Sequence, residues 1–365
     1  MKRMQWKIKT WSRGLGQITL GFAIAAALIT CHRHTPPVDQ SAESPSAATE
    51  DCQVINHDAG ETSVCGQPKN VVTVGPNMLE LLLALDVQPM GHAEYFPFPI
   101  PAFDQPEHQI PYLGVRLIGQ PRNIGTAHTP ALEVIAELKP DLILGDSLKN
   151  QDEYELLSQI APTLLFNYDD PNQDWQSDLR AIAQALNLSE RAETVIVDAR
   201  DRQAALRTAI APRATQTPNV LLLLGQQLDQ ELQIETRYSA CGSLLEALGF
   251  QVVVPEALEN SREPSHAISL EALPELDADL IIVEGFNREV NVPPDDPIEG
   301  QLQAIKQQWQ TNAIAQSLPA SQNNRVYFTT VYLCHALLGP IGTEIFLEQL
   351  HQQLTIGAND AKISP

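Results

Sequence analysis

The chain has 365 residues and a formal net charge of −22, with 45 acidic against 23 basic residues. So large an excess of acid opposes binding to nucleic acid or to an anionic membrane surface, because their phosphates repel it. The length is sufficient for two domains of ordinary size, each with its own core.

The first segment has the composition of an export signal. Its five basic residues precede an apolar run, 18–30, that is shorter than the roughly 20 residues a membrane-spanning helix needs. The run ends in Leu28-Ile29-Thr30-Cys31, which resembles a bacterial lipobox, although such motifs usually place Gly, Ala or Ser where Thr30 stands. We expect residues 1–31 to be a signal peptide with Cys31 as the lipidation site. An ordinary cleaved signal or an uncleaved anchor is the alternative.

The next segment, 32–51, is rich in Pro, Ser, Ala, Thr and acid, with too little apolar surface to offset the entropy of ordering it. We expect a disordered tether. The remainder is expected to divide into four parts: an N-terminal α/β lobe, linker helices, a C-terminal α/β lobe and a tail, at 52–172, 173–212, 213–356 and 357–365.

Alternating strands and helices are predicted on both sides of the linker. In the first lobe, apolar runs at 71–74, 141–144 and 163–166 read as strands, with helix patterns at 78–85 and 153–160. This alternation predicts a parallel sheet covered by helices on both faces. The second lobe repeats it, with predicted strands at 220–224, 252–254, 280–283 and 326–328 and predicted helices at 243–248, 270–276, 298–308 and 342–354.

A helical pattern between the lobes covers 189–211, and no Gly or Pro interrupts it before Pro212. A helix of that length spans about 35 Å, enough to cross from one lobe to the other as a rigid rod. An ordinary surface helix within one domain is the alternative. The predicted architecture leaves a cleft between the lobes, at the strand ends where open α/β sheets place ligands.

One short pattern occurs twice, 138 residues apart. Leu132, Glu133, Asp141 and Leu142 of the first copy correspond to Leu270, Glu271, Asp279 and Leu280 of the second. Each copy is predicted as an amphipathic helix that leads into an apolar strand. Self-similarity of this kind indicates two lobes of related architecture.

Apart from Cys31, four cysteines remain in a chain that we expect to be exported to an oxidising compartment. Cys52 and Cys65 are close in sequence, and a bridge between them would contribute about 3 kcal/mol by chain entropy. We expect this disulfide. Cys241 and Cys334 are 93 residues apart, so their pairing stays open at this point.

These patterns together resemble the helix-linked (class III, cluster A) periplasmic substrate-binding proteins of ABC importers, in the ferric-siderophore and ferric-dicitrate branch. The resemblance covers about 52–354. It is carried by Val72 to Asn77 with Glu80 to Leu85, by Asn123 to Thr126 with Leu138 to Leu144, and by Ile268 to Glu271. It implies two Rossmann-like lobes joined by a rigid helix. It also implies an exported, lipid-anchored monomer, in the periplasm or on the outer face of the plasma membrane, which binds an iron(III) chelate and delivers it to a permease dimer.

In that family, one glutamate on each lobe docks into arginine pockets of the permease, and by position in the repeat these resemble Glu133 and Glu271. The ordinary alternative is that both acids merely favour the first turn of a helix. Membrane contact is expected only through the N-terminal lipid.

Ligand contacts are expected from loops that follow strands, where Arg recognises anionic oxygens and aromatic rings cover apolar arms. The leading candidates are Arg116, Arg237 and Tyr95, followed by Asn77, Thr126, Tyr238 and Tyr332. Packing or solvation is the alternative for each. His128 and His335 could ligate iron or haem, although a hydrogen-bonded loop histidine is commoner.

Other functions fit the sequence less well. No Gly-rich phosphate loop, nucleophile elbow or cluster-type Cys set points to an enzyme, and no His-rich loop or HExxH points to a resident metal. We therefore expect neither catalysis nor a cofactor. A haem- or cobalamin-binding protein of the same transporter class is the main alternative.

Overall fold

The computed structural model describes residues 51–95, 100–167, 174–228, 230, 232–287 and 297–360, with side chains given except at 297 and 356–360. The chain divides after Thr49, and the second compact unit, Glu50–Pro365, contains every described residue. Cys31 and the signal lie outside them. None of the helices that the structure describes is both long enough and apolar enough to span a bilayer.

The N-terminal lobe begins with a hairpin of β1 (Cys52–His57) and β2 (Gly60–Cys65), in which Cys52 lies opposite Cys65. Its main sheet has the order β6-β5-β4-β3-β7-β8, parallel except for β6. The strands are β3 (Val71–Val74), β4 (Gly91–Glu94), β5 (Arg122–Thr126), β6 (Thr129–Pro130), β7 (Leu142–Asp146) and β8 (Thr163–Phe166).

Short helices connect these strands: α1 (Pro76–Ala84), α2 (Pro106–Gln109), η1 (Gly114–Arg116), α3 (Leu132–Leu138), α4 (Ser147–Asn150) and α5 (Tyr154–Ile160). β3 and α1 form where the apolar run 71–74 and the helix pattern 78–85 predict them. The predicted mainly parallel sheet flanked by helices is confirmed.

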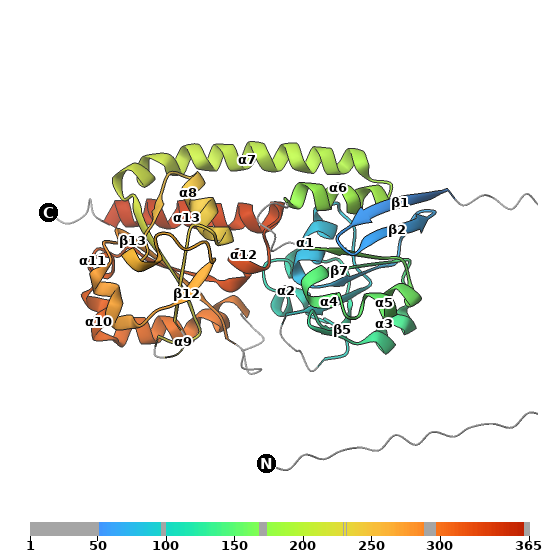
Figure 1. Ribbon diagram of the computed structural model, residues 1–365, viewed down its shortest axis with the longest axis horizontal. Helices are drawn as coiled ribbons and strands as arrows, with labels where there is room; N and C mark the ends of the chain where they lie inside the picture. Colours follow the sequence, from blue (N-terminus) through green and yellow to red (C-terminus); the bar gives the residue numbers. More distant parts are fainter. Residues whose placement is uncertain are drawn as a thin grey trace, which may run out of the picture. The chain divides into compact units, whose positions relative to one another are not determined.

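α6 (Trp175–Ala185) packs on the N-terminal lobe, and α7 (Ser189–Gln216) joins the two lobes. Figure 1 shows α7 as a single rod that runs along both lobes, with α13 (Pro340–Asp360) beneath it, and α7 packs on α6 and α13. The predicted end of this helix before Pro212 is wrong, because α7 continues past the proline for another turn. Pro212 donates no hydrogen bond, but Ile210 and Ala214 on either side of it are buried in the shared core and hold the helix in place.

The C-terminal lobe has the sheet order β12-β10-β9-β13-β14, with β11 paired to β9. Its strands are β9 (Asn219–Gly225), β10 (Gln233–Glu235), β11 (Gln251–Val252), β12 (Ser265–Ala267), β13 (Leu280–Gly285) and β14 (Val326–Thr330). Its remaining helices are α8 (Ala240–Ala247), η2 (Glu256–Leu258), η3 (Leu270–Glu275), α9 (Pro297–Thr311), α10 (Ala313–Ser317), α11 (Pro319–Gln322) and α12 (Val331–His335).

The second copy of the repeat differs from its prediction. The segment 270–276 is the 3-10 helix η3 rather than an α-helix, and its bonds run from residue i+3 to residue i, as in Ala272 N–H to Ser269 O. Pro274 lies inside it and has no N–H, which removes one α-type bond from an already short segment. The first copy, α3, has no proline and is α-helical.

A continuous apolar core crosses from one lobe to the other. Leu79 and Leu83 of α1 belong to the same buried cluster as Leu222 of β9 and Leu347 of α13. Burial of apolar side chains at this shared core stabilises the contact between the lobes independently of α7. The lobes are therefore joined by a packed interface as well as by α7.

Candidate functional site

Polar side chains gather where the parallel strands of the N-terminal lobe end. Asn77 is the second residue of α1, just after β3, Tyr95 follows β4, and Thr126 ends β5. The Nδ2 atom of Asn77 is buried and has no hydrogen-bond partner among the described residues, whereas Thr126 bonds to Thr129 with 2.8 Å between their hydroxyl oxygens. These three predicted site residues thus lie on one edge of the sheet, the edge at which such sheets place ligands.

Tyr95 is where the two lobes meet. Its hydroxyl donates to the carbonyl of His335 on α12 at 3.4 Å, and its ring lies 6.1 Å from the rings of His128 and Tyr332, measured between centroids. The Nζ atom of Lys149 lies 5.4 Å from the centroid of the same ring, within the range of a cation–π contact. A cation and aromatic surface therefore surround one residue at the lobe boundary.

Tyr332 is a structural contact in this state rather than an exposed ligand group. It is buried, and its hydroxyl donates to Oε1 of Glu94 at 3.1 Å. Burial, followed by the negative charge of Glu94, raises the pKa of Tyr332 well above its ordinary value. His92 Nε2 lies 3.5 Å from the other oxygen of Glu94, so the pair supports Tyr332 from within the N-terminal lobe.

A second polar cluster lies in the C-terminal lobe beside α12. His335 Nε2 is 2.7 Å from Glu235 Oε1 and 3.2 Å from Glu284 Oε2. Burial by itself lowers the pKa of His335, but its bonds to the two carboxylates outweigh that effect and raise it. Burial and the neighbouring Glu235 raise the pKa of Glu284. We expect an imidazolium that neutralises one of two adjacent acids.

A third buried acid, Glu80 of α1, holds the beginning of α13. Its two oxygens accept the backbone N–H groups of Gly339, Ile341 and Gly342 at 2.7–2.9 Å. These groups include first-turn donors that have no partner within the helix, and they favour a negative charge. A Cβ at Gly339 would lie 2.7 Å from Cδ of Glu80, which explains glycine there.

The two leading arginines lie outside the group around Tyr95. Arg237 is exposed and pairs with Glu246 of α8 at 3.8 Å, and Tyr238 beside it is also exposed. Both follow β10, which runs antiparallel to β9, so the chain there leads away from the carboxyl ends of the parallel strands. Arg116 is exposed at the end of η1, near enough to Glu80 that its charge lowers the pKa of that acid.

The repeated glutamates occupy matching places. Glu133 lies in the first turn of α3, three residues after Pro130, which pairs with Gly125 near the end of β5. Glu271 lies in the first turn of η3, four residues after Ala267. Ala267 pairs with Gln233 of β10, and Gln233 pairs with Leu224 near the carboxyl end of β9. Both side chains are exposed. Each lobe therefore presents one carboxylate near the carboxyl edge of its sheet.

Both cysteine pairs are disulfides in the structure. Cys52–Cys65 closes the hairpin of β1 and β2, with 3.9 Å between the Cα atoms. Cys241–Cys334 joins α8 to α12, with 5.2 Å between the Cα atoms, so it fixes the short helix that carries Tyr332 and His335. Sequence spacing alone left this second pair open.

Sequence reasoning missed four charged residues of these clusters: Glu80, Lys149, Glu235 and Glu284. Glu80 and Glu284 are each a single charge in or at the end of an apolar run, Leu79-Glu80-Leu81 and Ile282-Val283-Glu284. A lone acid at a buried position is costly unless it has a partner, so this pattern was an available signal. Glu235 lies among polar residues and gave no such signal. Lys149 had no comparable signal.

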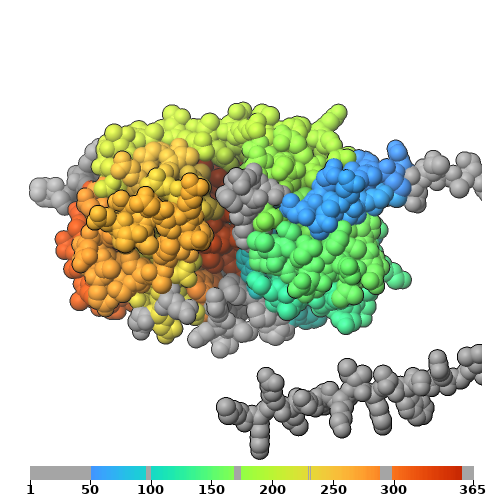
Figure 2. Space-filling view, in the orientation of Figure 1, coloured from blue at the N-terminus to red at the C-terminus, as the bar shows by residue number. Residues whose placement is uncertain are grey.

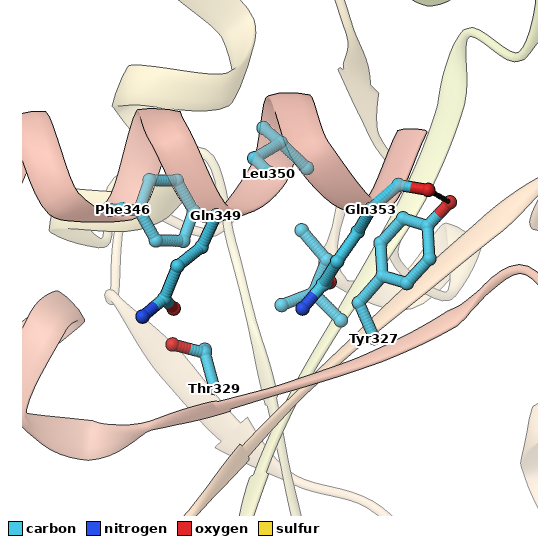
Figure 3. A pocket seen from close by; sticks show the side chains of 7 residues that line it. Tyr327, Thr329, Phe346, Gln349, Leu350 and Gln353 are labelled. Carbon is cyan, nitrogen blue, oxygen red and sulfur yellow. Dashed lines mark hydrogen bonds between the residues drawn. The ribbon is translucent and has the colours of Figure 1, made fainter. Parts of the chain in front are cut away.

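The surface is hollowed between the lobes, and segments late in the chain form the floor of the hollow (Figure 2). A separate small cavity of about 10 Å³ lies within the C-terminal lobe, between α13 and the sheet. Tyr327, Thr329 and Gln353 line it, and Tyr327 donates to the carbonyl of Gln353 at 3.1 Å (Figure 3). It has room for about one water, so it is not a chelate site.

Comparisons with known proteins agree with this architecture. The chain is 28% identical to the Fe(3+)-citrate-binding protein YfmC of Bacillus subtilis over 291 residues, which cover 78% of this chain and 80% of that protein. It is 28% identical to the Fe(3+) dicitrate-binding periplasmic protein FecB of Escherichia coli, over 71% of this chain and 76% of that protein.

Among solved structures, Staphylococcus aureus SirA complexed with staphyloferrin B matches with a TM-score of 0.63 and 23% identity, over 83% of this chain and 98% of that one. This likeness shows the fold. The model of the periplasmic binding protein family matches residues 71–333, more than two thirds of the chain. The chain therefore belongs to the periplasmic binding protein family.

Proposed function

We propose that this protein captures an iron(III) chelate, of the siderophore or ferric-citrate kind, between its lobes and delivers it to the permease of an ABC importer. The observation that carries the proposal is the similarity to YfmC and FecB over most of their length, since both are named for binding ferric citrate. The two-lobed structure supports it, because a hollow lies between the lobes.

The chelate would contact the group around Tyr95. Asn77 contributes a buried amide with an unused donor, and Thr126 lies on the same sheet edge. Tyr95 provides an aromatic face for the flat arms of such a ligand, and Lys149, which also pairs with Asp146, provides a cation beside it. Tyr332 supports this surface from the opposite lobe. Arg116 and Arg237 are candidates for a second, outer set of contacts.

Delivery would use Glu133 and Glu271 as docking groups for a permease dimer, one from each lobe. Both are exposed and lie at matching places near the carboxyl edges of the two sheets. The packed interface and α7 fix the distance between them. Charge-assisted bonds to arginine are directional, so two anchors at a fixed separation would set the register of docking. An N-terminal lipid on Cys31 would hold the protein at the membrane surface.

A ligand panel tests the proposal. Purified protein is titrated with ferric citrate, a ferric hydroxamate, a ferric catecholate, haem and cobalamin, and binding is followed by calorimetry. We expect saturable one-to-one binding of at least one ferric chelate, and Tyr95→Ala should weaken it about tenfold or more.

Tyr154→Ala is the matched control, because Tyr154 begins α5 and bonds to Thr62 of the β1–β2 hairpin, away from the group around Tyr95. It should bind like the wild type. Binding of haem or cobalamin with no response to any ferric chelate would reject the iron assignment and leave the family unchanged.

A further inference from the structure

Glu235, Glu284 and His335 converge from three separate elements. Glu235 ends β10, Glu284 lies near the end of β13, and His335 ends α12. One ligand atom from each lies within 4.8 Å of the other two, and His335 Nε2 is 2.7 and 3.2 Å from its neighbours. The disulfide between α8 and α12 holds this arrangement beside the lobe boundary.

The cluster has more acceptor capacity than it uses. Oε2 of Glu235 and Oε1 of Glu284 have no hydrogen-bond partner among the described residues, and both side chains are at most 1% exposed. Buried charges in proteins are normally paired or coordinate metals. A divalent cation held by two carboxylates and a neutral imidazole would balance both negative charges and use the oxygens that have no donor.

We propose that Glu235, Glu284 and His335 form a binding site for a divalent transition-metal cation of the Zn²⁺ class. One imidazole nitrogen and two carboxylate oxygens are ligands that zinc accepts, and ligand atoms around a tetrahedral zinc lie about 3.3 Å apart. His335 Nε2 lies 2.7 and 3.2 Å from the two carboxylate oxygens, and all three ligand atoms lie within 4.8 Å of one another. A mixed nitrogen and oxygen set favours zinc and its neighbours over Ca²⁺ or Mg²⁺, which prefer oxygen alone.

The site would keep one coordination position open. The His335 side chain is 37% exposed, and its carbonyl accepts from Tyr95, so the accessible side faces the lobe boundary. The sulfurs of Cys241 and Cys334 also lie within 4.8 Å of Glu284, but they are joined in a disulfide and are not thiolate ligands. All three ligands belong to the C-terminal lobe, so zinc binding can be measured in the absence of a chelate.

Zinc binding to the purified protein, prepared without a histidine tag and cleared of metal with EDTA, tests the proposal. Zinc sulfate is added and bound zinc is counted by equilibrium dialysis with elemental analysis. We expect one tightly bound zinc per chain and a rise in Tm on zinc addition, since a ligand of the folded state stabilises it. Glu235→Gln and His335→Gln should each weaken binding at least tenfold and abolish the rise in Tm.

His108→Gln is the matched control, because His108 is an exposed histidine that pairs only loosely with Glu107 at 3.9 Å. It should bind zinc like the wild type. Circular dichroism confirms that each variant is folded. The proposal is overturned if the wild type binds no zinc at micromolar concentrations, or if Glu235→Gln and His335→Gln both bind it normally, whatever the protein does with ferric chelates.

Discussion

Two groups of buried carboxylates lie near the lobe boundary, and they are used differently. Glu80 has both oxygens occupied by backbone N–H groups of the opposite lobe. Glu235 and Glu284 lie side by side in one lobe, share a single histidine, and leave two oxygens without donors. Equally buried acids therefore have different roles. Glu80, whose oxygens are both hydrogen-bonded, joins the two lobes, whereas Glu235 and Glu284 keep oxygens that can accept a ligand.

α12 and α13 are each fixed by a separate restraint. Glu80 fixes the beginning of α13, and the disulfide between Cys241 and Cys334 fixes α12. The surface around Tyr95 depends on both, because its partners Tyr332 and His335 belong to α12. Variants that lack either Glu80 or the Cys241–Cys334 disulfide therefore show how much each contributes to stability.

The largest effect on stability is expected from removing the disulfide beside the acid pair. Changing both Cys241 and Cys334 to Ser opens a cross-link between residues separated by 93 positions. Chain entropy predicts a loss of about 4.6 kcal/mol in the free energy of unfolding. Chemical denaturation measures it. The control is the double change of Cys52 and Cys65, which should cost about 3 kcal/mol and leave zinc and chelate binding intact. Weaker zinc or chelate binding in this control would contradict the placement of both sites away from the β1–β2 hairpin.

Replacing Glu80 should lower the free energy of unfolding by nearly as much. Glu80→Ala leaves three buried N–H groups without an acceptor, so we expect a loss of about 3 kcal/mol in the free energy of unfolding. Glu80→Gln keeps one acceptor oxygen and should lose less. If Glu80→Ala had the same denaturation midpoint as the wild type, the hydrogen bonds of Glu80 to α13 would not contribute to the stability of the lobe contact.

The stability of the wild type should depend on pH through the same residue. Burial raises the pKa of Glu80 to about 7, although its three N–H bonds and Arg116 oppose the rise. The folded protein then keeps a proton that the unfolded chain releases above its ordinary pKa near 4.5, so stability falls as pH rises from about 4.5 to about 7.

This contribution amounts to at most about 3 kcal/mol. Denaturation midpoints of the wild type and of Glu80→Gln, compared between pH 4.5 and 8, measure it. The difference between the two proteins should change with pH in that direction. A difference that does not vary with pH would remove Glu80 as its source.

The smallest effect on stability is expected at the exposed acids. Changing both Glu133 and Glu271 to Ala should alter the free energy of unfolding by less than about 0.5 kcal/mol, as surface substitutions usually do. Chelate affinity should also be unchanged, whereas uptake by cells should fall, more in the double variant than in either single one. Loss of chelate binding with normal uptake per bound ligand would place these residues in the cleft instead.

Much of the fold could be predicted from periodicity. Val71–Val74 and Leu280–Gly285 are apolar runs bounded by turn residues, and both are buried central strands. Local rules failed at two prolines. Pro212 did not end α7, because packing of its neighbours in the core outweighed the lost bond, and Pro274 favoured a 3-10 helix where the repeat predicted an α-helix.

The candidate site could be predicted only in part. Loops after parallel strands indicated Asn77, Tyr95 and Thr126, because strand direction is implied by the alternation of elements. Arg237 was favoured for its charge, but β10 is antiparallel, a property that no local pattern encodes. The cluster of Glu235, Glu284 and His335 depends on contacts between distant residues, so only Glu284, a lone acid at the end of an apolar run, indicated it.

The position of iron in crystals of the protein grown with the ferric chelate that binds most tightly tests the central claim most directly. The anomalous signal of iron locates the metal without assumptions about the ligand. We expect one iron, inside its chelate, between the lobes and within contact distance of the group around Tyr95. Iron bound elsewhere on the surface, or held by Glu235, Glu284 and His335 without a chelate, would contradict it.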